Sequence, residues 1–470
     1  MGIDLVSILN QSAQSLAAHR AAAATASQNI ANVNTPGYSR QTANLEAITP
    51  TDFVANTFIG SGVQLQSVTQ ARDQFLERQM HNAFASSGFS STESQALTAV
   101  SALDPDGGNG LTAALGAFYT ALRGVAQNPS DSGLRQGAVS AAESLAQTFN
   151  RTATSLEDAR SGLDAKMSGI VADVNQAASA MAALNVQIQQ SRVTGAEPND
   201  LLDARQRLQD KLSQLTGAVP VVDDQGDVSM ALPGGADLVG ALKAGSLLLT
   251  PDPNNSGHFS VMMMRADGTG PASLTASQLG GQLAGAMSAR DGAILTAKNG
   301  IDQMAFDFAN TVNGVHSAGF AADGTTGHLM FNVGATSVDA ASSLTVDASL
   351  VANPSLLAAA AAPGASGDNR NMQALVNTER TALSSGADVT TTYQNLVTAF
   401  GSKSALSKAI ADQDSGMVDH LTQLREGTSG VNLDEEMVNL TKAQRAFEAV
   451  SKVITTANDM LDTLLNLKSG

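Results

Sequence analysis

The chain has 470 residues, a formal net charge of −17 and neither cysteine nor tryptophan. The lack of cysteine excludes disulfides and thiolate metal sites, and the acidity argues against nucleic acids and anionic membranes as partners, since both require a basic surface. Only 4% of the residues are aromatic, which is typical of long, closely packed helices rather than of an enzyme with rigid binding pockets.

The first predicted element is a helix over residues 4–32. Apolar or small side chains recur there at steps of three and four. Most of them are Ala or Ser, so a second helix can approach closely while little apolar area is buried. Pro36 and Gly37 then predict a turn. The pattern of apolar residues is mixed over 44–68, and helical spacing returns over 71–84.

The next part of the chain predicts a helical bundle. Residues 91–103 and 111–127 have helical spacing and end at turns that contain proline. The apolar stripe then continues over 134–191 without a proline, which predicts a single helix of about 60 residues and about 90 Å. A rod or bundle needs such a length, whereas a compact domain does not. Asn199 is expected to cap a further helix over 200–216.

The hydrophobic period changes to two between 218 and 276. Short apolar runs alternate there with Gly, Pro and Asp turns and predict a small β-rich insertion. Helical spacing resumes over 283–315, and residues 323–367 are expected to be extended. Further helices are expected over residues 371–384, 393–411 and 417–425.

The last predicted helix spans residues 432–467 and carries an unbroken apolar stripe. Asn432 follows Gly430 and is expected to cap this helix, with Glu435 completing a capping box. Because the first and last helices each have a stripe, the two ends of the chain are expected to pair with each other. The small stripe of the first helix makes that pair marginal alone, so neighbouring copies are expected to complete it.

Two long motifs border these end helices. The first reads Ala31-Asn32-Val33-Asn34-Thr35-Pro36-Gly37-Tyr38-Ser39-Arg40-Gln41 and resembles the N-terminal signature of the bacterial flagellar axial proteins, which are the rod, hook and hook-associated subunits. The second reads Gly430-Val431-Asn432-Leu433-Asp434-Glu435-Glu436-Met437-Val438-Asn439-Leu440, continues to Leu464-Leu465-Asn466-Leu467, and resembles their C-terminal signature. The Tyr-Ser-Arg-Gln run and the Asn-Leu ending are most similar to the hook-associated members. The resemblance is looser but colinear through the middle of the chain.

The periodicity and the resemblance together predict a mainly α chain. It has paired N- and C-terminal coiled-coil helices, a long α-helical bundle domain and small β-rich insertions. The expected domains are a terminal-helix unit of residues 1–45 and 431–470, a bundle of 46–217, 281–320 and 368–430, a β-rich insertion of 218–280, and an extended or β segment of 321–367.

No set of residues predicts catalysis or metal binding. None of the six histidines has the spacing of a helical zinc site, and His19 lies on the stripe of the first helix, where an interface role is expected. Residues 104–109 resemble the start of a calcium loop, but Leu115 stands where a bidentate Glu is required, so a turn is expected. The methionines at 262–264 cannot converge on one ion from a strand. We therefore expect no catalytic residue, no cofactor and no metal.

The resemblance implies a structural subunit of the bacterial flagellum, which forms the junction between hook and filament by helical self-assembly through its terminal helices. It implies contacts with other copies, with the hook protein and with the next hook-associated protein on the flagellin side. It also implies a cytoplasmic export chaperone on the C-terminal helix. Neither nucleic acid nor membrane insertion is expected. The residues expected at the assembly interface are Leu5, Leu9, Leu16, Ile30, Asn34, Pro36, Gly37, Tyr38, Leu433, Met437, Leu440, Phe447, Val450, Ile454, Leu461 and Leu464.

Several other functions fit parts of the sequence. A hook or distal-rod subunit is the nearest alternative. A secreted coiled-coil binding module would have no need of the two terminal motifs, and a murein hydrolase would need a catalytic set that the sequence does not offer. No apolar run reaches the ~18 residues of a membrane span, and no basic segment precedes an apolar one as in a secretory signal, which alone would indicate a cytoplasmic protein. The resemblance instead implies an extracellular flagellar location, reached by export without a cleaved signal peptide.

Overall fold

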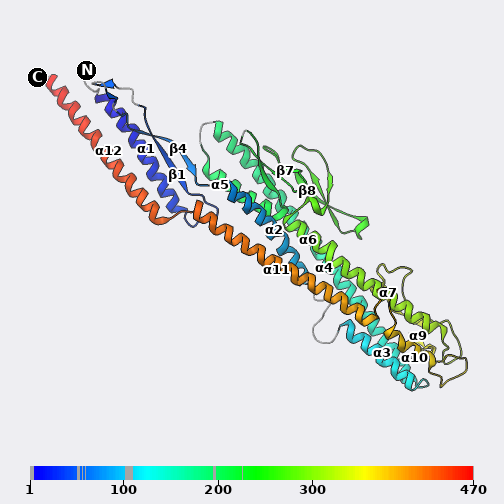
Figure 1. Ribbon diagram of the computed structural model, residues 1–470. Coiled ribbons are helices and arrows are strands. Elements are labelled where there is room, and N and C mark those ends of the chain that lie inside the picture. Colours follow the sequence, from blue (N-terminus) through cyan, green and yellow to red (C-terminus); the bar gives the residue numbers. More distant parts are fainter. Residues whose placement is uncertain are drawn as a thin grey trace.

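The computed structural model describes residues 5–49, 53–54, 57–58, 60–100, 110–193, 197–224 and 226–468. The elements form a long rod of helices, which is continued at one end by the pair of the first and last helices (Figure 1). The mainly α architecture with small sheets that the sequence predicts is confirmed. The turn expected at 104–109 lies outside the described residues.

The terminal pair consists of α1 (Leu5–Ala31) and α12 (Leu433–Lys468). The two helices lie side by side and run antiparallel, as the stripes at both ends of the chain predict (Figure 1). The residues that α1 buries are small or polar, so the two backbones approach closely. An antiparallel hairpin follows α1 and packs beside it. Its strands are β1 (Gln41–Ala47) and β4 (Val63–Gln70). Between them in the sequence, β2 (Phe53–Val54) and β3 (Thr57–Phe58) form a separate antiparallel pair.

The rod is organised around α4, a helix of 62 residues that is about 93 Å long at 1.5 Å per residue. The long unbroken helix expected in this part of the chain is therefore confirmed. Segments from before and after α4 in the sequence pack along it (Figure 1). The helices of the rod are α2 (Gln74–Thr98), α3 (Leu111–Gln127), α4 (Ser132–Val193), α5 (Asn199–Thr216), α6 (Gly281–Ser288), the π-helical turn η3 (Ala289–Ile294), α7 (Leu295–Ala318), α10 (Arg370–Asn377) and α11 (Val389–Ser429).

Two helix interruptions expected from the sequence are wrong. Residues 71–84 and 91–103 contribute to one helix, α2, which runs through Gly88. A Cβ at Gly88 would lie 2.2 Å from the carbonyl oxygen of Gln214, so this glycine permits a close helix crossing rather than ending a helix. Similarly, α11 runs through Gly416, where a Cβ would meet nothing within 4 Å. An exposed glycine weakens a helix by about 1 kcal/mol, which a long helix tolerates.

One hydrophobic core runs along the rod. At the end far from α12, aromatic rings from α3, α7 and β11 pack together, with the ring centroids of Phe118 and Phe308 5.7 Å apart. Phe331 lies 5.4 Å from Phe308 and closes the cluster. Such edge-on aromatic contacts add to the free energy of apolar burial, so this end of the rod is firmly packed.

The segment expected to be extended over 321–367 is only partly so. The short strands β11 (Phe331–Asn332) and β12 (Thr345–Val346) pair antiparallel. A short helix, α8 (Ala340–Ser343), lies between the two strands in the sequence, and a second, α9 (Ala348–Ala352), follows β12. The Asp347 side chain accepts from the N–H of Ser349 and caps α9. Turn and cap chemistry of this kind favours helical turns that are too short to produce a visible helical period.

The β-rich insertion expected after α5 is present and comprises two three-stranded antiparallel sheets. Their inner faces join the core of the rod, through residues such as Met230 and Val261. The side chain of Asn175 on α4 accepts from the N–H of Leu247 at 2.8 Å and donates to its carbonyl at 2.9 Å. It thereby satisfies both backbone groups of one residue of β8, as a neighbouring strand would. The strands are β5 (Val219–Val222), β6 (Val228–Ala231), β7 (Asp237–Val239), β8 (Ser246–Pro251), β9 (Phe259–Met264) and β10 (Ala272–Leu274).

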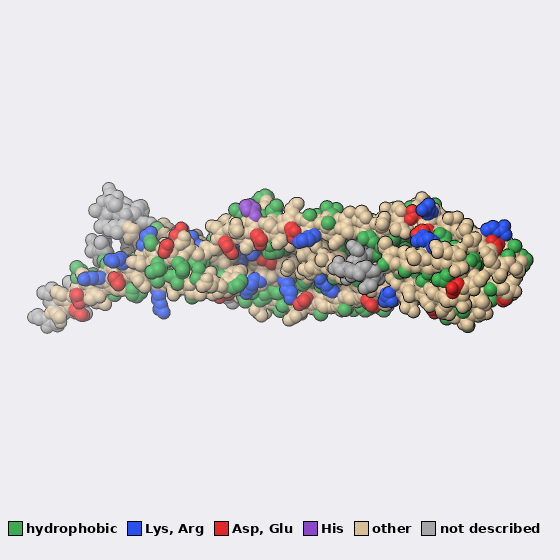
Figure 2. All heavy atoms as spheres, turned by 90° about the horizontal axis from the view of Figure 1, so that it is seen from below, with side chains coloured by type: hydrophobic (Ala, Val, Ile, Leu, Met, Phe, Trp, Pro, Cys, Tyr) green, Lys and Arg blue, Asp and Glu red, His purple; other side chains and the backbone are tan. Residues whose placement is uncertain are grey.

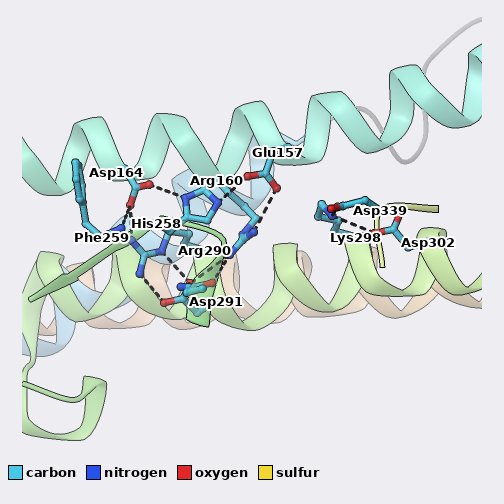
Figure 3. Close-up of polar contacts among 11 residues, drawn as sticks. Glu157, Arg160, Asp164, His258, Phe259, Arg290, Asp291, Lys298, Asp302 and Asp339 are labelled. Carbon is cyan, nitrogen blue, oxygen red and sulfur yellow. Dashed lines mark hydrogen bonds and ion pairs between the residues drawn. The ribbon is translucent and has the colours of Figure 1, made fainter. Parts of the chain in front are cut away.

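A buried ionic cluster joins the insertion to the rod (Figure 3). His258, just before β9, lies between two carboxylates of α4, with Nδ1 2.6 Å from Asp164 and Nε2 2.7 Å from Glu157. Arg290 of the turn η3 is 1% exposed and pairs with both Asp164 and Asp291. Since the buried guanidinium of Arg290 has carboxylate partners, the cluster fixes the β8–β9 hairpin and η3 against α4 without leaving that charge isolated.

Candidate assembly site at the base of the terminal helix pair

The candidate site is the junction at which the terminal pair meets the rod. Two stretches of chain cross there, namely the turn between α1 and β1 and the break between α11 and α12. Gly37 in the first stretch has a φ of +74°, which favours glycine. In the second, α11 ends at Ser429, and its carbonyl accepts from the N–H of Arg40 at 2.8 Å. This backbone bond ties together segments from opposite ends of the sequence.

Asn432 caps α12, as its position after Gly430 predicts. Its side-chain oxygen accepts from the N–H groups of Asp434 and Glu435 at 3.0 and 3.4 Å. The second half of the expected capping box is wrong, because the Glu435 carboxylate pairs with Arg40 at 3.2 Å instead. This ion pair joins α12 to the segment after α1, so a residue expected to act within one helix acts between two.

Asn29 is the centre of a buried polar network between α1 and α12. Its side chain is fully buried and makes the four hydrogen bonds that an amide can make. Nδ2 donates to the Gln41 carbonyl at 2.8 Å and to the Glu436 carboxylate at 3.0 Å, while Oδ1 accepts from the Gln41 N–H at 3.0 Å and the Tyr38 hydroxyl at 2.8 Å. Arg40 Nε donates to the other oxygen of Glu436 at 2.8 Å. These hydrogen bonds set the relative position of α1, the turn after it and α12.

A second set of contacts joins this network to the rod. Asp203 of α5 accepts from Arg72 Nη2 at 2.6 Å, from Gln70 Nε2 at 3.0 Å and from the Ser39 N–H at 3.3 Å. Burial, together with the negative charges of Asp203 and its neighbours, raises the pKa of Tyr38 to about 12. The hydroxyl of Tyr38 therefore keeps its proton and remains a donor to Asn29.

Asn199 was expected to cap α5, and this prediction is wrong. Asn199 is the first residue of the helix itself, after Pro198. Its side chain donates to the Val68 carbonyl of β4 at 2.9 Å, and its own carbonyl accepts from Gln70. A polar side chain at the start of a helix can hydrogen-bond either to the backbone of its own helix or to another segment. The side chain of Asn199 bonds to the hairpin.

A hollow of about 520 Å³ lies between the turn after α1 and the helices α2, α5 and α11. Arg425 of α11 is 2.9 Å from Asp210 and 3.7 Å from Glu77 at its edge, and His81 Nε2 is 3.3 Å from Asp210. Burial opposes ionisation of Asp210, but hydrogen bonds and charge from His81 and Arg425 outweigh it and lower its pKa. Burial, reinforced by the charge of Asp210, raises the pKa of Glu77.

The residues expected at the assembly interface differ in how far the single chain buries their side chains. Those on the facing sides of α1 and α12 come together but remain partly exposed, and they are Leu5, Leu9, Leu16, Ile30, Leu440, Phe447, Val450, Ile454 and Leu461. Tyr38 also lies half-buried in the network. The others are exposed, and they are Asn34, Pro36, Gly37, Leu433 and Met437. The side chain of Leu464 is not described. His19, expected at an interface, is half-buried and lines a groove beside α12.

The polar residues of the junction are the ones that periodicity missed. Asn29 and Glu436 are separated by 407 positions, so no local pattern pairs them. Arg72 and Asp203 are likewise distant in sequence. A usable signal is that the two terminal motifs hold several residues of the network, among them Arg40 and Glu436. The chemistry of the junction is hydrogen bonding and ion pairing between separate segments, which positions the terminal pair on the rod.

Comparison with known proteins agrees with this architecture. Residues 97–331 match the flagellar hook-associated protein FlgK helical domain, and residues 426–467 match the flagellar basal body rod FlgEFG protein C-terminal region. The chain is 27% identical to flagellar hook-associated protein 1 of Salmonella typhimurium over 555 residues, covering 98% of this chain and 100% of that protein. Its identity to flagellar hook-associated protein 1 of Bacillus subtilis is 27% over 496 residues, with 97% of each chain covered.

A solved structure has the same fold. The flagellar hook junction protein FlgK from Burkholderia pseudomallei superimposes with a TM-score of 0.66 at 17% identity, covering 75% of this chain and 100% of that one. The paired end helices, the helical rod and these matches define a structural axial subunit of the bacterial flagellum. Within that class, the chain belongs to the family of flagellar hook-associated proteins with the FlgK helical domain. Within the described ranges, no helix has the length and apolar character needed to cross a membrane.

Proposed function

We propose that this chain forms the junction between hook and filament by self-assembly through the α1–α12 pair. The observation that carries the proposal is the incomplete burial of that pair. Its large apolar side chains, such as Phe447 and Ile454, are only half-buried in the single chain, while small residues such as Ala443 and Ala457 are fully covered. A helix pair of this kind retains apolar surface for further helices, which neighbouring copies would supply.

The energetics of the pair support assembly over isolated folding. Ordering one residue costs about 1–2 kcal/mol in backbone conformational entropy. Burial gives about 25 cal/mol per Å² of apolar surface, and the small side chains of α1 offer little such surface. The pair is therefore marginal in one chain and gains stability when copies surround it. The network around Asn29 and Glu436 then sets the preferred direction in which each rod leaves the assembled core.

Two features support a place among other axial proteins. The C-terminal region, residues 426–467, matches the rod proteins of the flagellum, so α12 would pack in a core of the same kind as theirs. The curated relatives are hook-associated proteins, and the solved relative is a hook junction protein. The hook on one side, and the next hook-associated protein on the flagellin side, are then the neighbours. The location is the outer end of the hook, reached by export without a cleaved signal peptide, and the function is structural rather than enzymatic.

The apolar face of α12 also suggests how the chain is handled before assembly. An exposed apolar helix face is an aggregation hazard, and a groove in an export chaperone that accepts that face would remove it. The half-buried side chains that face α1, among them Phe447, Val450 and Ile454, would serve the chaperone first and the assembly later. The two uses would exclude each other.

The test uses cells from which the chain has been removed. Electron microscopy should show hooks without filaments, with flagellin in the medium, and the intact chain should restore filaments. The variant Phe447→Asp places a charge on the face of α12 that packs against α1, and it should leave hooks bare. The control Ala405→Asp adds the same charge at an exposed position of α11 and should restore filaments. Filaments in cells that lack the chain would refute the junction role.

A further inference from the structure

The helix α11 has a second apolar face that no other part of the described chain covers. One face packs on α2, where Ser407 and Leu421 are buried. On another face of the same helix, three large apolar side chains stay about half exposed: Ile410 is 43% exposed, Met417 51% and Leu424 46%. A surface helix of a globular protein needs one apolar face, so the second face requires a separate explanation.

The exposed side chains form a line along the helix. Ile410, Met417 and Leu424 are seven residues apart, and Leu406, which is 58% exposed, precedes Ile410 by four. At 3.6 residues per turn this spacing places the four on one side of α11, over about 27 Å at 1.5 Å per residue. We call them the α11 stripe. A line of apolar side chains at heptad spacing suits a long contact with another helical surface.

The charges around the α11 stripe indicate what can cover it. Asp412, Asp419 and Glu426 project from the opposite side of the helix, by the same helical geometry. Asp414 stands only at the edge, beside Ile410 in a shallow groove between α2, α11 and the insertion. Lys403, seven residues before Ile410, continues the line, but it pairs with the buried carboxylate of Glu93 at 3.0 Å. The stripe therefore offers no unpaired charge that would hold a basic or an anionic partner. Its partner must therefore be apolar and uncharged at the point of contact.

The overall charge selects a second copy of the chain as that partner. Two chains of net charge −17 repel each other, so close packing between copies is favoured at faces that are free of carboxylates. The α11 stripe is such a face. Figure 2 shows hydrophobic side chains at the surface along the rod. Past the junction, the exposed Leu433 and Met437 follow on α12.

We propose that the α11 stripe is the surface through which the rod of one copy contacts the rod of a neighbouring copy. The inference rests on the proposed function, because it needs an assembly in which rods lie side by side. Four partly exposed side chains offer far less than the about 800 Å² per partner of a stable two-protein interface. The contact therefore forms only when the terminal pairs hold the copies together, and the free chain stays monomeric.

The lack of cysteine makes a direct test available, since a single introduced thiol is unique in the chain. Met417→Cys places a thiol on the stripe, and Asp419→Cys places one on the opposite, exposed side of α11. Each variant is the sole source of the chain in cells, and maleimide labelling is compared between purified monomer and isolated flagella. Labelling of Cys at 417 should fall about tenfold on assembly, while that at 419 changes little. Equal labelling at 417 in both states would overturn the proposal.

A crosslinking arm identifies what covers the stripe. A benzophenone maleimide attached to the thiol at 417 is irradiated in isolated flagella, and the adducts are digested and sequenced by mass spectrometry. Adducts between two copies of this chain are expected. Adducts only with another flagellar protein would overturn the choice of a second copy. A misfolded Met417→Cys variant could also protect its thiol from labelling. The purified Met417→Cys monomer must therefore have the same melting temperature as the parent.

A charge variant separates this inference from the proposed function. Met417→Glu puts a carboxylate on the α11 stripe, and Ala405→Glu puts one on its exposed flank. The first should reduce the fraction of hooks that carry filaments several-fold while the melting of the monomer is unchanged, and the second should not. If the intact chain fails to restore filaments, the junction role itself is wrong. If it restores them and Met417→Glu does so equally, only the contact between rods is wrong.

Discussion

Replacing His316 with leucine tests how the end of the rod far from α12 is held together. The imidazole of His316 is fully buried on α7. Its Nδ1–H donates to the carbonyl of His328 at 2.7 Å, and Nε2 accepts from the N–H of Ala358 at 3.0 Å. The ring thus pairs backbone groups of two separate loops, and it can do so only in the neutral form, because Nε2 must accept. Burial lowers the pKa of His316 to about 4.

The magnitude follows from proton linkage. The unfolded chain binds a proton at this ring below pH ~6.5, whereas the folded chain resists protonation until about pH 4. Between these values the unfolded state holds more protons, so the contribution of His316 to stability is complete above pH ~6.5 and is lost as the pH falls. The difference in pKa corresponds to about 3 kcal/mol at 1.36 kcal/mol per pKa unit.

The assay is urea unfolding followed by circular dichroism near pH 7 and near pH 4.5. His316→Leu leaves two backbone groups unpaired and should lower the free energy of unfolding by about 1–3 kcal/mol near neutral pH. The difference in free energy of unfolding between parent and variant should become smaller on acidification, because only the parent loses stability through protonation of His316. His420→Gln, at an exposed position of α11, is the matched control and should follow the parent at both pH values. If the difference in free energy of unfolding between parent and variant is the same at both pH values, the proposed role of His316 is wrong.

Three further outcomes are expected. Gly88→Ala should destabilise the rod by about 1–3 kcal/mol because its Cβ would collide with a neighbouring backbone, whereas Gly116→Ala, with open space at its Cβ, should be neutral or stabilising in the same urea assay. Hydrogen exchange of the monomer should be fast in α1 and α12 and slow in α4; slow exchange in both terminal helices would contradict a pair that is marginal alone. In pull-downs with the cytoplasmic export chaperone, a peptide starting at Val431 should bind and a chain ending at Gly430 should not, and binding by that truncated chain would place the chaperone site in the rod.

Periodicity predicted the helices well because helical burial repeats locally. The stripe over 134–191 required one long helix, and α4 is that helix. Local reasoning failed around Gly88, where two helices are expected from the sequence and one is present. The hydrogen atom of this glycine makes room for the Gln214 carbonyl of another helix. That reason depends on packing between distant segments, so the sequence near Gly88 does not contain it.

The candidate site shows the same division between local and distant information. The end helices and their pairing follow from their stripes, and Asn432 as a cap follows from its place after a glycine. The partners of Glu435, Asn199 and Asn29 do not follow, because each side chain binds a segment that only the register of the folded chain brings near. Polar side chains at helix ends have several possible partners, and sequence distance gives no reason to prefer the remote one.

The chemical difference between the rod and its junction has a mechanical consequence. Bending the rod would open a continuous apolar core around a helix about 93 Å long, which is resisted over its whole length. At the junction, by contrast, a few directional bonds around Asn29 and Asp203 set the angle, beside a hollow of about 520 Å³. Water can replace such bonds one at a time. The rod of each copy is therefore stiff, whereas its angle to the terminal pair can change. A difference in curvature between two tubes would be accommodated by changes in this angle, while the rods keep their shape.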